Sequence, residues 1–123
     1  MGSGGYALLV EDDADVGALL RHHLGALRYE VQHVTSAEEA LSRIAERSPE
    51  LAVVDILLPG ADGRVVVHAL RTTPEHRDCR VIVATIVDRD DLGVEADAYL
   101  AKPFRRSDLV RAMECAGLGG DAA

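Results

Sequence analysis

The chain has 123 residues, 48% of them hydrophobic, and a formal net charge of -8 at pH 7. This length fits one domain with an ordinary core, and the hydrophobic fraction argues against disorder. The negative charge argues against a nucleic-acid or anionic-membrane surface, and the lack of any membrane-length apolar run or signal segment predicts a soluble, cytoplasmic protein.

Apolar residues follow two spacings in alternation along the chain. Short runs rich in Val, Ile and Leu read as strands buried on both faces. Longer stretches with apolar residues three or four positions apart read as amphipathic helices, and Ser36 with Glu39 matches a helix capping box. The predicted order is strand 6–10, helix 14–27, strand 29–34, helix 37–47, strand 51–55, helix 64–73, strand 81–85, a short polar stretch at 88–95, strand 98–101 and helix 106–116.

A strand–helix repeat of this kind predicts a parallel sheet with right-handed crossovers and helices on both faces. Every strand then ends at the same edge of the sheet, where α/β proteins bind their ligands. Polar side chains follow four different strands at this edge, namely Glu11 and Asp12, Asp55, Thr85 and Lys102. Their convergence is the main functional signal of the sequence.

Asp55 closes a short apolar run, in the stretch LAVVDILLPGADG. Taken alone, Asp55 could simply cap the following turn, as Asp residues often do. Facing the acids at 11 and 12, however, it would require a cation, and carboxylate oxygens suit a hard ion such as Mg²⁺. A carboxylate oxygen of Asp55 could then attack phosphorus, with Lys102 and Thr85 contacting the phosphoryl oxygens.

Four motifs at four strand ends give the chain its resemblance to a known family. They are LLVEDD at 8–13, VVDILLPGADG at 53–63, VIVAT at 81–85 and AYLAKPF at 98–104. Together they resemble the receiver domain of bacterial two-component response regulators, including the chemotaxis response regulator. The resemblance implies a flavodoxin-like, doubly wound sheet of order 2-1-3-4-5 with five helices. It covers residues 6–116, the receiver domain, while the composition of residues 1–5 predicts a leader and that of residues 117–123 a flexible tail.

The resemblance also assigns roles to individual residues. It implies that Asp55 is the phosphoacceptor for a sensor histidine kinase or phosphotransfer protein, and that the signal passes to an output domain or partner protein. The implied Mg²⁺ ligands are Glu11, Asp12, Asp55 and the backbone carbonyl of Leu57. The implied phosphate-binding and switch residues are Thr85, Lys102 and Tyr99, and the implied cis peptide is Lys102–Pro103.

Three positions depart from the family pattern. Leu57 and Val87 are apolar where polar residues are frequent, and Ile86 is large where a small residue is usual. Because apolar side chains cannot place a hydrolytic water, we expect slow dephosphorylation and slow charging by small donors. Only fourteen positions separate Thr85 from Tyr99, so the fourth helix should be shortened or irregular and mobile, and a dimer through that face weakened.

Two alternatives come from other classes. A degenerate receiver would act as a docking module without phosphorylation. The second alternative is an enzyme. A flavodoxin-like cofactor protein is disfavoured, because the acids after the first strand would repel a phosphate. An aspartyl-phosphate phosphatase is disfavoured too, because such enzymes usually have a second acid where this chain has Leu57. We therefore expect no enzyme activity beyond the domain's own phosphoryl transfer and slow autodephosphorylation.

Overall fold

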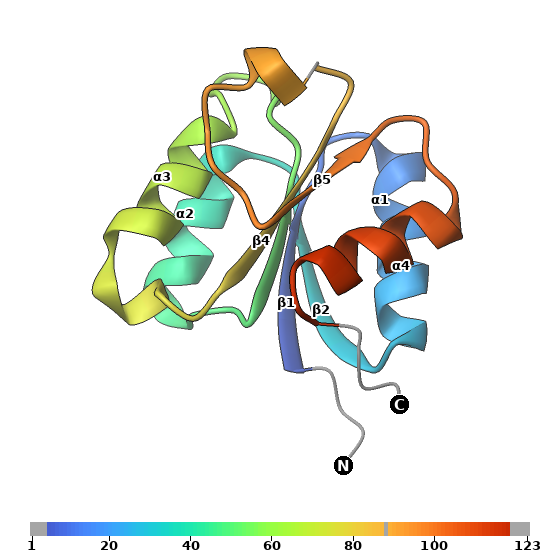
Figure 1. The fold of residues 1–123 in the computed structure, drawn as a ribbon. Helices are drawn as coiled ribbons and strands as arrows, with labels where there is room; N and C mark the ends of the chain where they lie inside the picture. Colours follow the sequence, from blue (N-terminus) through green and yellow to red (C-terminus); the bar gives the residue numbers. More distant parts are fainter. Residues whose placement is uncertain (1–4, 88, 119–123) are drawn as a thin grey trace.

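The computed structural model describes residues 5–87 and 89–118 and has three layers, with a parallel sheet between two pairs of helices (Figure 1). Helices α2 and α3 cover one face of the sheet, and α1 and α4 cover the other. The elements are β1 (Gly5–Val10), α1 (Ala14–Ala26), β2 (Tyr29–Val34), α2 (Ala37–Glu46), β3 (Leu51–Val54), α3 (Arg64–Thr72), a 3-10 helix (Pro74–His76), β4 (Arg80–Thr85), a second 3-10 helix (Arg89–Asp91), β5 (Ala98–Ala101) and α4 (Arg106–Cys115).

The strand order is β2-β1-β3-β4-β5 and every pair is parallel, which confirms the predicted fold class. Val10 is paired with Val34 on one side and with Val54 on the other, and Thr85 is paired with Ala101. Val54 is also paired with Val83, so β4 continues for two residues beyond the end of β3, and all the strands end at the same edge of the sheet. The residues that follow them lie together at the upper edge in Figure 1.

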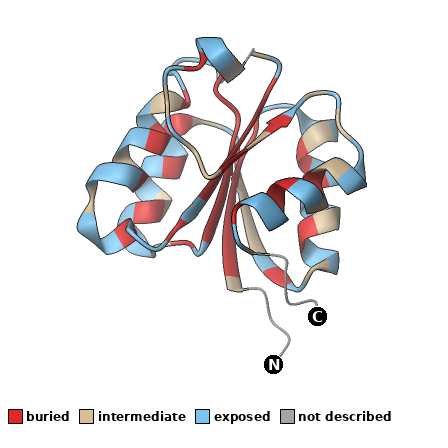
Figure 2. Ribbon diagram, viewed as in Figure 1, coloured by how far each residue is buried: buried red, intermediate tan, exposed pale blue. Residues whose placement is uncertain are grey.

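The core consists of two apolar clusters, one on each face of the sheet, and the strands are buried along most of their length (Figure 2). Strand side chains alternate between the two clusters, as in any strand covered on both faces. Val66 and Val67 are buried against α2 and the sheet. Their burial explains why α3 forms despite three consecutive β-branched residues, which disfavour a helix.

Local hydrogen bonds fix the starts of two helices. The Asp13 carboxylate accepts the backbone N–H groups of Asp15 and Val16 and so caps α1. Ser36 Oγ accepts the N–H of Glu39 at the start of α2, while the Glu39 carboxylate reaches back to Thr35. These side chains satisfy donors that the first turn of a helix leaves without partners.

The crossover from β4 to β5 departs from the five-helix expectation. Its described residues form a single 3-10 turn and irregular chain, so the described part of the molecule has four α-helices. The expectation of a shortened or irregular fourth helix is confirmed; Asp88, which was expected to begin it, lies outside the described residues. Among the described residues, no helix combines the length and apolar character needed to span a bilayer.

Candidate functional site

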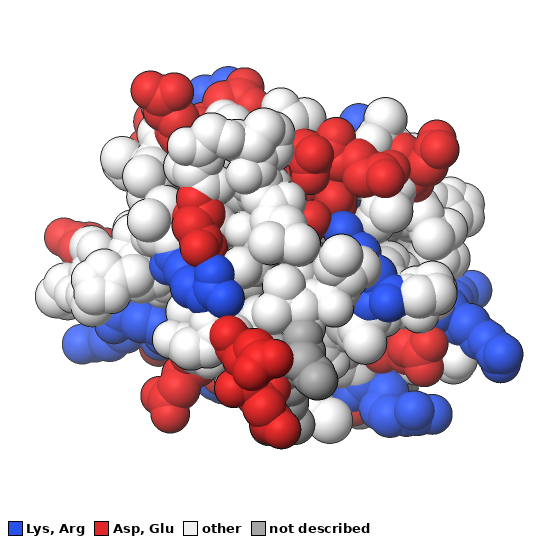
Figure 3. Space-filling model, turned by 90° about the horizontal axis from the view of Figure 1, so that it is seen from above, with Lys and Arg blue, Asp and Glu red and all other residues white. Residues whose placement is uncertain are grey.

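Three acids and one lysine meet at the upper edge of the sheet. Lys102 Nζ lies 2.7 Å from Glu11 Oε1 and 3.0 Å from Asp55 Oδ2. Oxygen atoms of Glu11, Asp12 and Asp55 all lie within 4.8 Å of one another. Glu11 and Asp55 are buried, whereas Asp12 is exposed. Seen from above this edge, acidic side chains gather on the side of α1, beside a largely uncharged centre (Figure 3).

Backbone hydrogen bonds hold Glu11, Asp55 and Lys102 one position beyond their strands, and Asp12 follows Glu11. The N–H of Glu11 donates to Val34 O (3.1 Å), and the N–H of Asp55 donates to Val10 O (2.9 Å). The N–H of Lys102 donates to Thr85 O at 3.1 Å. The side chains therefore leave the ladder at its end and turn toward one point, as the parallel topology predicts.

The charges of the site are strongly coupled. Burial raises the pKa of the Glu11 carboxyl, and the neighbouring charge of Asp55 adds to the rise, although Lys102 opposes both. Burial by itself would lower the pKa of Lys102, but its contacts with Glu11 and Asp55 outweigh that effect and leave the pKa above its ordinary value. Lys102 therefore stays protonated, and it is the only lysine in the chain.

The residues present fit a divalent cation. The three carboxylates of the cluster exceed the single ammonium by two charges. Glu11 Oε1 is buried and pairs with the ammonium, but no aligned hydrogen bond reaches it from the described residues. Oxygen donors at this density are the ligands that Mg²⁺ prefers.

The loop after Asp55 is packed closely against the site. The N–H of Leu57 donates to Asp55 Oδ1 (3.0 Å), so both carboxylate oxygens of Asp55 have partners. The N–H of Gly63 donates to Ile56 O (2.8 Å). A side chain at position 63 would overlap the Asp55 carbonyl oxygen and approach Ile56 Cα to 2.9 Å. Only a glycine at position 63 allows this close approach.

The two switch candidates make other contacts. The Thr85 hydroxyl is buried and accepts the N–H of Val87 at 3.3 Å. The Tyr99 hydroxyl donates to Val94 O (3.1 Å) and accepts the N–H of Ala96 (3.2 Å). The structure therefore joins Tyr99 to the irregular crossover.

The remaining candidates surround the site. Leu57 and Ile86 are exposed, at 50% and 71%, and Val87 is half-buried. The Lys102–Pro103 peptide bond is cis. Leu57 and Ile86 therefore face solvent, whereas Val87 packs partly against the core.

Two arginines of α3 that the sequence analysis did not single out hold the crossover. Arg64 pairs with Asp62 and donates to the carbonyl oxygens of Asp91 and Leu92. Arg71 donates to Glu95 O and to the Asp97 carboxylate. These contacts replace part of the backbone bonding that a helix would provide. Helical spacing carries no signal for them, because each guanidinium reaches a distant loop.

The chain is similar to known proteins over most of its length. The family model "Response regulator receiver domain" matches residues 7–114. The phosphate regulon transcriptional regulatory protein PhoB of Rhizobium meliloti is 34% identical over 107 residues, which are 83% of this chain and 47% of PhoB. This chain thus spans about half the length of that relative.

Two solved structures add to the likeness. The receiver domain of the sensor histidine kinase PA1611 from Pseudomonas aeruginosa, with a magnesium ion in its active site cleft, is 27% identical with a TM-score of 0.80, covering 91% of this chain and 97% of its own. The response regulator TrrA from Thermotoga maritima, in complex with Mg²⁺ and beryllofluoride, is 28% identical with a TM-score of 0.80, covering 91% and 98%.

Proposed function

The chain belongs to the response regulator receiver domain family, and on that premise we propose that it accepts a phosphoryl group on Asp55 and passes the signal to a partner. The observation that supports this most directly is the buried contact between Asp55 Oδ2 and the Lys102 ammonium, 3.0 Å apart, within an acidic cluster at the sheet edge. A residue serving only as a turn cap would not need a buried cation.

The proposed step is an in-line displacement. A carboxylate oxygen of Asp55 forms a bond to phosphorus while the phosphorus–nitrogen bond of a donor phosphohistidine breaks, and the electron pair leaves on the imidazole nitrogen. Lys102, whose ammonium lies 3.0 Å from Asp55 Oδ2, would contact the incoming phosphoryl oxygens. The Thr85 hydroxyl, which now accepts a bond from Val87, would turn to donate to one of them.

We propose that Glu11, Asp12 and Asp55 hold Mg²⁺, with the Leu57 carbonyl as a further ligand. The ion would neutralise charge on the phosphoryl oxygens. Both Glu11 and Asp55 pair with Lys102, so the single ammonium balances only part of their charge, and a cation would balance the rest.

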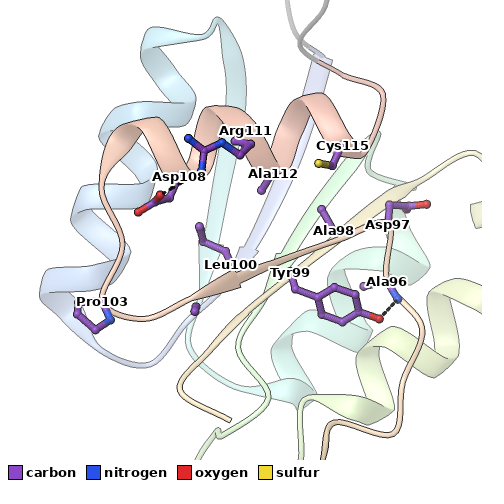
Figure 4. A pocket seen from close by; sticks show the side chains of 11 residues that line it. Ala96, Asp97, Ala98, Tyr99, Leu100, Pro103, Asp108, Arg111, Ala112 and Cys115 are labelled. Carbon is purple, nitrogen blue, oxygen red and sulfur yellow. Dashed lines mark hydrogen bonds and ion pairs between the residues drawn. The ribbon is translucent and has the colours of Figure 1, made fainter. Parts of the chain in front are cut away.

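The output surface that we propose is the face formed by the crossover, β5 and α4. Tyr99 links β5 to the crossover, and beside it lies a groove of about 450 Å³ between β5 and α4 (Figure 4). A move of the Tyr99 ring would break its bonds to Val94 and Ala96 and so reshape this face. We expect partners to read this loop, and dimers through it to be weakened.

The kinds of partner follow from the relatives. PhoB is a transcriptional regulatory protein and PA1611 is a sensor histidine kinase, so receiver domains occur beside different outputs. For this chain we propose a histidine kinase or phosphotransfer protein as donor and an output domain or separate protein as receiver of the signal. Its own chemistry would be limited to phosphoryl transfer and slow hydrolysis.

Phosphorylation is tested by incubating the protein with Mg²⁺ and acetyl phosphate and measuring intact mass, with beryllofluoride binding followed by NMR as a second readout. We expect Asp55 to be modified, and Asp55→Asn or EDTA to prevent it. Asp108→Asn, which changes an acid outside the site, is the matched control. A folded wild-type protein that neither gains a phosphoryl group nor binds beryllofluoride would instead support the phosphorylation-independent docking module.

A further inference from the structure

One imidazole supports the backbone of the acidic loop from outside the metal-binding cluster. His33 Nε2 lies 2.8 Å from the carbonyl oxygen of Glu11. A carbonyl only accepts, so Nε2 must carry the hydrogen and donate it. The ladder between β1 and β2 ends at the pair Val10 and Val34. The side chain of His33 thus supplies a donor to Glu11 just beyond the last pair.

A glycine in α1 leaves the space that the His33 imidazole occupies. Gly17 is a buried position in the first half of α1, where glycine is unfavourable relative to alanine. A side-chain carbon at position 17 would overlap the His33 ring and lie 2.7 Å from Nε2. The space that the His33 ring needs therefore explains the glycine inside this helix, because any larger residue at position 17 would displace the ring from Glu11.

Both backbone groups of Glu11 are consequently held by the end of β2. Its N–H donates to Val34 O at 3.1 Å, and its carbonyl accepts from His33. The Glu11 carboxylate in turn accepts the N–H of Asp13 at 3.2 Å. The imidazole thus fixes the residue from which one buried oxygen ligand of the cluster projects.

We propose that His33, admitted by Gly17, is a positioning residue for the divalent-cation site. This inference rests on the proposed function, because it concerns the site in which Glu11 would bind Mg²⁺. Residues that hold metal ligands in place typically change metal affinity by about 10- to 100-fold when they are substituted.

The test compares Mg²⁺ dissociation constants, measured by calorimetry, with urea unfolding midpoints. His33→Leu keeps bulk but removes the donor, and should raise the dissociation constant about 10-fold. His33→Gln, whose amide can donate to the same carbonyl, should restore affinity. Ile44→Val, a core change on the opposite face of the sheet, should lower the unfolding midpoint without changing Mg²⁺ affinity.

Gly17→Ala provides a second, independent arm. Alanine favours the helix, but its Cβ would push the imidazole away, so Mg²⁺ affinity should fall although His33 is present. If His33→Leu binds Mg²⁺ as the wild type does, or if His33→Gln fails to restore affinity, the inference is wrong and the proposed function stands. A wild-type protein that binds no Mg²⁺ would overturn both.

Discussion

Replacing Lys102 by methionine would leave two buried carboxylates without their cation. Lys102 Nζ lies 2.7 Å from Glu11 Oε1 and 3.0 Å from Asp55 Oδ2, and its side chain is 13% exposed. At an effective dielectric constant of about 20, Coulomb's law gives each contact a gross attraction of about 6 kcal/mol. Most of this offsets the desolvation of the charges, so the better guide is the loss of about 3–5 kcal/mol seen when one partner of a buried pair is removed.

That loss is large against a domain stability of about 5–15 kcal/mol. Urea unfolding followed by circular dichroism, at pH 7.5 without Mg²⁺, should show Lys102→Met with a midpoint lower by about 2–3 M, for an m value of about 1.5 kcal/mol/M. Arg111→Met is the matched control. Its ion pair with Asp108 spans 4.0 Å and the arginine side chain is 73% exposed, so the change should be small.

The contribution of Glu11 to the free energy of unfolding should depend on pH. The pKa of Glu11 is raised by burial above its unfolded value, so its favourable contribution is complete below pH 4.5 and declines as pH rises through the folded pKa. Lys102 opposes that rise, so its removal should raise the Glu11 pKa further.

The deficit of Lys102→Met should therefore shrink as the pH is lowered toward 4.5, because the Glu11 carboxyl takes up its proton at a higher pH in the variant than in the wild type. Added Mg²⁺ should also reduce the deficit at pH 7.5. A variant as stable as the wild type at pH 7.5, or one whose deficit is the same at both pH values, would refute the reasoning.

Two further predictions concern the loops around the site. Arg64→Ala removes two charge-assisted hydrogen bonds to carbonyl oxygens of the crossover, each worth about 1.5–3 kcal/mol. Amide hydrogen exchange at residues 90–97 should therefore become at least about 10-fold faster, while exchange in α1 is unchanged. Equal protection in both proteins would contradict this. Combining Leu57→Asn with Val87→Glu supplies polar groups that can place water, and should shorten the acyl-phosphate lifetime at Asp55 at least about 10-fold. Decay can be followed by Phos-tag electrophoresis, with Leu57→Met as control, and an unchanged lifetime would refute the hydrolysis argument.

The residues that gather at the sheet edge could be predicted from the sequence, because parallel topology alone brings the strand ends together. Glu11, Asp55 and Lys102 each follow an apolar run, and parallel order then places them at one edge. Their mutual distances were not predictable, since these depend on how each chain leaves its strand. Side chains that reach across loops, such as Arg64, leave no mark in local spacing.

Two glycines, Gly17 and Gly63, lie where another part of the chain packs closely against the backbone. Gly17 interrupts a helical pattern, and an isolated glycine there usually has a packing or functional reason. That reason, the ring of His33, lies on β2 and is visible only once α1 is packed against the sheet. Gly63 is a similar case, because the carbonyl oxygen of Asp55, just beyond the end of β3, lies against it.

Because the chain has a single lysine, Lys102, the site can be labelled selectively with amine-reactive reagents. Apart from the amino terminus, Lys102 carries the only primary amine, and arginine supplies every other strongly basic side chain. Its limited exposure and its raised pKa make that amine a poor nucleophile toward acylating reagents while the contacts with Glu11 and Asp55 persist. The rate of amine labelling therefore measures how often the cluster opens. Reductive methylation with ¹³C, which preserves the charge, would place one NMR reporter beside the phosphoacceptor.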